Sequence, residues 1–83
     1  MNKEDLEQAL RQLELPQLEV RVIPEGLRFT AVVTTPAFTD MDEADRQRQV
    51  WGHLRERFSD RDLIRIEFIF TDSPDDDAAA ESA

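Results

Sequence analysis

The first hydrophobic residues of the chain recur at the spacing of an α-helix. Four apolar side chains fall at positions i, i+3, i+4 and i+7 and form one stripe: Leu6, Ala9, Leu10 and Leu13. Asn2 can cap the first turn, and Pro16 lacks the N–H that a longer helix would need. The pattern therefore predicts an amphipathic helix from about residue 3 to residue 14.

Two runs of alternating apolar and polar residues follow, which is the pattern of strands with one buried face. The apolar positions of the first run are Leu18, Val20 and Val22. The apolar positions of the second run are Leu27, Phe29, Ala31 and Val33. Between them, residues 23–26 end in Gly26, which can adopt the positive φ of a tight turn. We predict an antiparallel hairpin.

A long helix is predicted from Asp40 or Asp42 to Phe58, because acidic residues gather at its start and basic residues at its end. On a helical wheel, five apolar residues share one face: Ala44, Val50, Trp51, Leu54 and Phe58. Gln47 falls inside that face. The opposite side is predicted to face solvent and to hold Arg46, His53 and Arg57.

The last predicted strand runs from Leu63 to Thr71, after a turn or a single helical turn over residues 59–62. Its core face is predicted to hold Ile64, Ile66, Phe68 and Phe70. A helix between the second and third strands allows a parallel crossover. We therefore predict an α+β fold, α-β-β-α-(α)-β, with a three-stranded mixed sheet and helices on one face. The other face is predicted to be polar, with Glu19, Arg21, Arg28, Thr30, Arg65 and Glu67.

The length of 83 residues fits one domain, and the charge is concentrated at one end. Ten Lys and Arg stand against nineteen Asp and Glu, which gives a net charge of −9. Residues 72–83 hold five acids and no base: Asp72, Asp75, Asp76, Asp77 and Glu81. Because this segment has no large apolar residue, we expect one folded domain over residues 1–71 and an acidic disordered tail over residues 72–83. The negative charge disfavours direct binding of nucleic acid.

The side chains that carry most enzyme chemistry are nearly absent. There is no cysteine, which excludes disulfides and thiolate metal sites. His53 is the one histidine, with no evident partner residue, and Asp75 to Asp77 lack the spacing of a calcium loop. We expect no catalytic residue, no metal and no cofactor, and hence no enzyme. No apolar run could span a membrane and the first residues are no signal peptide, so we expect a cytoplasmic protein that binds no membrane.

Two segments carry a recognisable motif. Phe38 is followed eight residues later by residues 46–54, R-Q-R-Q-V-W-G-H-L, and residues 64–76 read I-R-I-E-F-I-F-T-D-S-P-D-D. They resemble the motifs F-x-G-x-S-x-x-x-R-H-R-x-V-Y-x-x-L and I-H-A-L-S-L-K-T-x-T-P-E-E of the BolA family. The matching residues are Phe38, Arg46, Arg48, Val50, Leu54, Thr71 and Pro74, with Trp51 in place of the tyrosine. The resemblance implies a BolA-like fold, which has the same element order and is related to the type II KH fold.

The histidines of the family motifs are replaced in this chain. In the BolA family they serve an iron–sulfur cluster shared with a monothiol glutaredoxin. Gln47 stands at the histidine of R-H-R, and Arg65 at the histidine of the last strand. Glutamine is a poor ligand for iron in such a site and arginine is none, so we expect no iron–sulfur ligation by residues of this chain. Nucleic-acid binding of the KH kind would need a G-x-x-G loop, whereas Gly26 and Gly52 lie far apart.

These observations predict a small non-catalytic adaptor or regulatory protein that acts through protein–protein contacts. The resemblance suggests a monothiol glutaredoxin as the protein partner. The predicted partner-binding residues include an edge formed by Gln47, Arg48 and Arg65, and the full set is Phe38, Arg46, Gln47, Arg48 and Arg65. An alternative is an acidic structural or chaperone-like interaction protein that is unrelated to iron–sulfur handling. This alternative includes the case in which the protein is a homodimer. It would use the polar sheet face and the tail, so deleting residues 72–83 would discriminate between the two.

Overall fold

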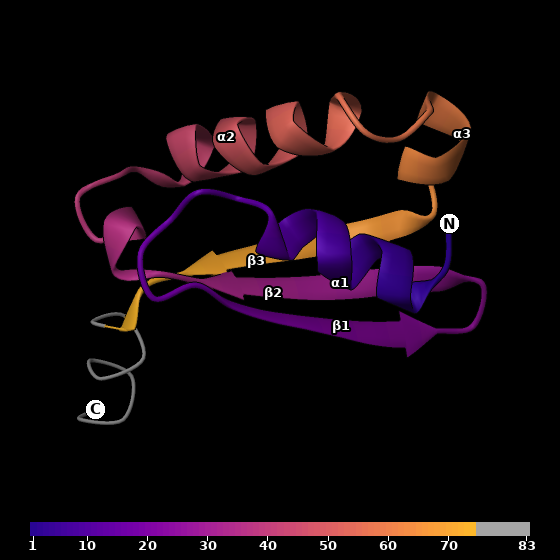
Figure 1. Ribbon diagram of the computed structural model, residues 1–83, viewed down its shortest axis with the longest axis horizontal. Coiled ribbons are helices and arrows are strands. Elements are labelled where there is room, and N and C mark those ends of the chain that lie inside the picture. The colour runs from indigo at the N-terminus through magenta and orange to yellow at the C-terminus, as the bar shows by residue number, and fades with distance from the viewer. Residues whose placement is uncertain (75–83) are drawn as a thin grey trace.

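The computed structural model describes residues 1–74 of the chain. Its elements in chain order are α1 (Lys3–Arg11), β1 (Glu19–Glu25), β2 (Arg28–Thr34), the 3-10 turn η1 (Pro36–Phe38), α2 (Glu43–Arg55), α3 (Asp60–Leu63) and β3 (Ile66–Asp72). The sheet has the order β1-β2-β3, with β1 antiparallel to β2 and β2 parallel to β3. In Figure 1, α1 lies against β1 and α2 runs along β3. The predicted element order and the mixed sheet are confirmed.

The fold continues slightly beyond the predicted end of the domain. β3 includes Asp72, which pairs with Thr34, and the side chain of the next residue, Ser73, is fully buried. The rest of the predicted tail, residues 75–83, lies outside the described residues. Within residues 1–74, no helix has the length and apolar character needed to cross a membrane.

The hydrophobic core lies between the sheet and the two longer helices. α1 begins in a capping box, in which Asn2 accepts from the Asp5 N–H at 2.8 Å and the Asp5 carboxylate accepts from the Asn2 N–H at 3.1 Å. The predicted apolar stripe of α1 is buried. It packs with side chains from all three strands and from α2: Val22, Phe29, Ala31, Val33, Val50, Leu54, Ile66 and Ile69.

The hairpin is present, but its turn is shorter than predicted. β1 continues through Glu25, which pairs with Arg28, so the turn consists of Gly26 and Leu27 alone. Gly26 has a φ of +64°, which glycine adopts without the penalty that a Cβ would add. The prediction that Leu27 faces the core is wrong, because the turn carries this side chain out of the sheet and leaves it 84% exposed.

Replacing each of the two glycines with alanine should change the unfolding free energy in opposite directions. No atom lies within 4 Å of a Cβ added at Gly26, so Gly26→Ala should lose only about 1 kcal/mol of unfolding free energy, through its positive φ. Gly52 lies inside α2 with the same open space, so Gly52→Ala should gain about 1 kcal/mol through helix propensity. Urea denaturation of both variants measures the two changes in unfolding free energy. A destabilised Gly52→Ala variant would contradict this helix geometry.

Pro24 blocks the free edge of β1. Phe29 donates its N–H to the Arg65 carbonyl, on the side of β3. The residue that pairs with Phe29 across the hairpin is Pro24, and its backbone therefore points away from β2 and toward the free edge. Because proline has no N–H, it cannot support the pairing of an added strand at this point.

A β-bulge in β3 changes which residues reach the core. The pairing with β2 skips one residue, Glu67, and the alternation of side chains is reversed after it. Ile69 is therefore buried at 1% exposure, whereas Phe68 and Phe70 are each 49% exposed. The prediction that Phe68 and Phe70 belong to the core is wrong for this reason. Ile64 was also predicted to be buried, but it precedes the strand and is exposed.

The open face of the sheet is apolar at its centre rather than polar as predicted. The bulge places Phe68 and Phe70 there, beside Val32 of β2. Arg65, which was predicted to lie on this face, instead places its guanidinium over the ring of the core residue Phe29, 5.4 Å from the ring centroid. The sheet therefore has two partly apolar faces, of which the helices cover one.

α2 turns Val50, Trp51 and Leu54 toward the core as predicted, but three other residues lie differently than predicted. Its buried residues are Arg46, Val50 and Leu54. His53 is half-buried, and its Nε2–H donates to the Ala9 carbonyl of α1 at 2.6 Å. Ala44 is exposed. The predictions of a solvent-facing Arg46 and His53 and of a buried Ala44 are wrong, because a hydrophobic wheel ignores polar side chains that are satisfied by backbone carbonyls.

Candidate functional site

The segment before α2 is fixed by hydrogen bonds within the segment and to the Pro16 carbonyl, and these hold Phe38 in the core. The Thr35 hydroxyl donates to the Pro16 carbonyl at 2.6 Å and accepts from the Ala37 N–H at 3.2 Å. Asp42 then caps α2 by accepting from the Asp45 N–H at 2.8 Å. Phe38, a predicted partner-binding residue, is 0% exposed and cannot itself contact a partner.

Arg46 joins the start of α2 to the end of β3. Its Nε donates to the Met41 carbonyl at 3.0 Å and its Nη1 donates to the Thr71 carbonyl at 2.9 Å. The guanidinium carbon lies 5.7 Å from the Phe38 ring centroid, within the range of a cation–π contact. A Glu43 carboxylate oxygen lies 3.9 Å from Nη1. Arg46 is 8% exposed, so its contacts are those of a structural residue.

The Gln47 side chain is likewise engaged with β3. Its Nε2 donates to the Ile69 carbonyl at 2.7 Å and to the Thr71 hydroxyl at 3.2 Å. Its Oε1 accepts from the Trp51 indole N–H at 3.0 Å. The Thr71 hydroxyl in turn donates to a Glu43 carboxylate oxygen at 2.7 Å. The position of the motif histidine is thus occupied by an amide that uses both its nitrogen and its oxygen within the fold.

Together, Arg46 and Gln47 protect the free edge of β3. The Asp72 carbonyl accepts from the Thr35 N–H on the side of β2. Since carbonyls alternate along a strand, those of Ile69 and Thr71 point to the opposite, free edge. These are the two carbonyls that Gln47 and Arg46 contact. An incoming strand would have to displace both side chains before it could pair with β3.

Arg48 is the exposed member of the predicted set on α2. Its side chain is 74% exposed, and its Nη1 lies 2.9 Å from the Asp45 carboxylate in an i, i+3 pair. Exposed pairs of this kind contribute little to stability, about 0–1 kcal/mol. Arg48 is therefore available to a partner without loss of the fold.

Arg65 lies apart from the other predicted residues, near the opposite end of β3. Its Nε donates to the Leu27 carbonyl at 3.2 Å, and its Nη1 donates to the Met1 carbonyl at 2.9 Å. Along the strand, roughly 13 Å separate Arg65 from Ile69, which Gln47 contacts. The structure therefore brings Phe38, Arg46 and Gln47 together, with Arg48 beside them, but it does not form one edge that includes Arg65.

The described residues offer little for metal chemistry. Within residues 1–74, no group of three or more His, Asp or Glu side chains is placed to hold a metal ion. Asp75 to Asp77, for which no metal was expected, lie outside the described range. His53 is held against α1 by its contact with the Ala9 carbonyl.

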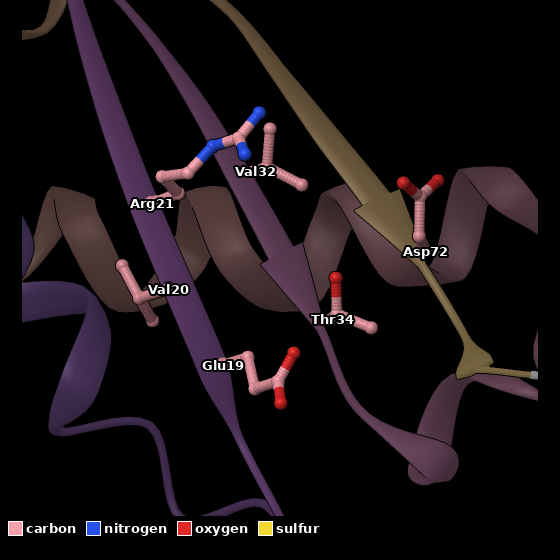
Figure 2. A pocket seen from close by; sticks show the side chains of 6 residues that line it. All are labelled: Glu19, Val20, Arg21, Val32, Thr34 and Asp72. Carbon is pink, nitrogen blue, oxygen red and sulfur yellow. The ribbon is translucent and has the colours of Figure 1, made fainter. Parts of the chain in front are cut away.

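A second surface lies on the open face of the sheet, and the sequence did not indicate its apolar character. A shallow hollow of about 450 Å³ lies there, lined by Glu19, Val20, Arg21, Val32, Thr34 and Asp72. Figure 2 shows the Arg21 guanidinium beside Val32, with the Glu19 and Asp72 carboxylates nearer the end of the sheet. The one hint in the sequence is Ile69, an apolar residue among the polar positions of the predicted strand.

Comparison with known proteins identifies the fold. No protein-family model and no curated protein matches the chain. A Bol-like protein from Babesia bovis is similar over 98% of this chain and 94% of its own, with a TM-score of 0.63 and 22% identity. BolA1 from Arabidopsis thaliana is similar over 90% of this chain and 95% of its own, with a TM-score of 0.61 and 19% identity. The fold predicted from the motifs is thus confirmed, and this protein has the α+β fold of the BolA-like proteins.

Proposed function

We propose that this protein is a small non-catalytic adaptor or regulatory protein that acts through protein–protein contacts. Its BolA-like fold supports the proposal. The two residues that stand at the histidine positions of the family motifs support it as well. Gln47 and Arg65 both hydrogen-bond to backbone carbonyls of their own chain. The contact of Gln47 with the Ile69 carbonyl at 2.7 Å carries the proposal, because it makes this side chain part of the fold.

Ligation of an iron–sulfur cluster by this chain is not part of the proposed function. To reach a metal, the Gln47 side chain would have to release the Ile69 carbonyl and the Thr71 hydroxyl. Each buried acceptor that loses its donor costs about 1–3 kcal/mol. An amide is also a poor ligand in a site that prefers thiolate and imidazole. A monothiol glutaredoxin can still dock on this surface without receiving a ligand from it.

The proposed docking surface is the exposed side of α2 around Arg48. A carboxylate of the partner can compete with Asp45 for this guanidinium, because the present pair is exposed to water. Phe38 and Arg46 are buried and contribute by holding the start of α2 in place. Gln47 sets the distance between α2 and the edge of β3.

Arg48→Glu should weaken docking of a cluster-loaded monothiol glutaredoxin by about tenfold in Kd, because it replaces attraction with repulsion. Its unfolding free energy should fall by no more than about 1 kcal/mol, because the pair with Asp45 is exposed. The measurement is a titration of the isotope-labelled chain, followed by backbone amide shifts together with visible absorbance of the cluster. Arg61→Glu is the matched control, since it makes the same charge change at an exposed position on α3.

The titration separates docking from ligation. Amide shifts at Gln47 and Arg48 with an unchanged cluster spectrum would support docking without ligation. An altered spectrum would show that this chain supplies a ligand, and it would overturn the argument from Gln47. If α2 shows no shifts, or if Arg48→Glu and Arg61→Glu weaken binding equally, the α2 surface is not the docking site.

A further inference from the structure

The open face of the sheet carries an apolar patch that runs across all three strands. It consists of Ile23 of β1, Val32 of β2, and Phe68 and Phe70 of β3. These residues belong to two neighbouring sets of residues that pair across the three strands. The rings of Phe68 and Phe70 lie edge to face, with centroids 4.7 Å apart and an interplanar angle of 62°. Within residues 1–74, α1 and α2 pack on the other face, which holds the core. We call these four residues the open-face patch.

The patch exists only because of the bulge at Glu67. Without the extra residue, strict alternation would direct Phe68 and Phe70 into the core and Ile69 to the open face. The bulge reverses this, so that two phenylalanines are left 49% exposed while Ile69 is buried. Exposed aromatic area of this kind adds no burial energy to the fold, and it marks contact surfaces for other molecules. Bulges commonly redirect side chains in this way next to functional sites.

A partner reaches this sheet more easily through the open face than through its edges. Pro24 removes the N–H at the free edge of β1. Arg46 and Gln47 occupy the outward carbonyls of β3. Addition of a strand is therefore hindered on both sides, and side-chain contacts with the open-face patch are what remains.

The charges around the patch select the chemistry of the occupant. Acids prevail over bases on this surface: Glu19, Glu25, Glu67 and Asp72 against Arg21 and Arg28. Consider two copies packed with their open faces together. If the twofold axis runs parallel to the strands, Glu19 of one copy faces Asp72 of the other. If the axis runs perpendicular to the strands within the interface, Glu19 of one copy faces Glu25 of the other. A second copy therefore brings like charges together, and a nucleic-acid backbone would be repelled in the same way.

We propose that the open-face patch binds a segment of a partner protein in which apolar side chains lie next to lysine or arginine. The apolar side chains pack on Phe68 and Phe70. The basic side chain enters the hollow of Figure 2 near the Glu19 carboxylate. The proposal goes beyond the docking surface at Arg48 and does not depend on it, since α2 and the open-face patch lie on opposite faces of the sheet. It gives the adaptor the second surface that joining two partners requires.

The first test uses defined peptides and the whole labelled chain. A fluorescein-labelled amphipathic peptide of alternating Leu and Lys clusters is titrated to about 1 mM, and backbone amide shifts locate its binding site. We expect shifts around Arg21, Val32, Phe68 and Phe70. A Ser/Lys peptide of equal charge should bind about tenfold more weakly, because it lacks the apolar side chains. A Leu/Glu peptide should not bind.

Substitutions then separate the apolar from the electrostatic contribution. The double variant Phe68→Ser, Phe70→Ser should bind the Leu/Lys peptide at least about tenfold more weakly. The matched control is Leu27→Ser, Ile64→Ser, which removes two apolar side chains that lie outside the patch and are even more exposed, and it should bind normally. Glu19→Lys should weaken binding by about threefold to tenfold, and Glu14→Lys, an equal charge change at an exposed site on another surface, should not.

Several outcomes would overturn the proposal. Absence of binding at 1 mM would do so, and so would shifts confined to residues 75–83 or to α2, since the peptide would then follow charge alone. Equal weakening by the patch variant and its control would do the same. Sedimentation of the peptide-free chain as a dimer that Phe68→Ser, Phe70→Ser dissociates would assign the patch to a second copy instead. Binding of a single-stranded oligonucleotide to the patch would assign it to nucleic acid.

Discussion

Replacing Arg46 with methionine should lower the free energy of unfolding by about 2–4 kcal/mol. Methionine fills much of the same space, but the carbonyls of Met41 and Thr71 would lose donors that now lie at 3.0 and 2.9 Å. Because Arg46 is only 8% exposed, water cannot readily replace these donors. Urea denaturation should show a lower midpoint with an unchanged slope.

Arg48→Met is the matched control, because Arg48 lies on the same helix with a side chain that is 74% exposed. It should change the unfolding free energy by less than about 0.5 kcal/mol. Arg46→Lys should fall between the two, since one ammonium group cannot reach two carbonyls as a guanidinium does. An unchanged midpoint for Arg46→Met would mean that relief from burying a charge offsets the lost contacts. The contacts of Arg46 with Met41 and Thr71 would then make no net contribution to the stability of the fold.

Much of the architecture can be predicted because short-range patterns determine it. The stripe of α1, its Asn2 cap and the alternation of β1 and β2 each depend on residues within one element. The parallel pairing of β2 with β3 follows from the helix between them. These features were predicted correctly because few competing arrangements bury the same residues.

The roles of the side chains at the candidate site depend on contacts between distant segments, which local patterns do not report. Arg46 is buried because the Thr71 carbonyl, twenty-five residues away, accepts a hydrogen bond from its guanidinium. The alignment with the family motifs gave Gln47 and Arg65 one shared role. Such an alignment does not say how far apart two residues lie in space, and these two lie near opposite ends of β3. Sequence reasoning could name these residues but could not say which of them reach solvent.

Replacing Phe38 with alanine should have the largest effect on stability, about 3–5 kcal/mol. Phe38 is 0% exposed and is the largest fully buried side chain of the core. This loss is comparable with the whole stability expected for a domain of this size, roughly 4–11 kcal/mol. Thermal unfolding followed by circular dichroism should show a Tm at least about 12 °C lower, or no folded state. Phe38→Leu, with a smaller loss of about 1 kcal/mol, keeps the test informative if the alanine variant does not fold.

Phe70→Ala is the control that also tests the bulge. In the structure it removes a half-exposed ring and one edge-to-face contact with Phe68, so it should lose only about 1 kcal/mol. The sequence pattern had placed these two phenylalanines the other way round, with Phe38 at a partner surface and Phe70 in the core. If Phe70→Ala were as destabilising as Phe38→Ala, β3 would have to pair without the extra residue at Glu67, and the open-face patch would not exist. A large difference between the two variants therefore supports both the buried position of Phe38 and the aromatic surface on the open face of the sheet.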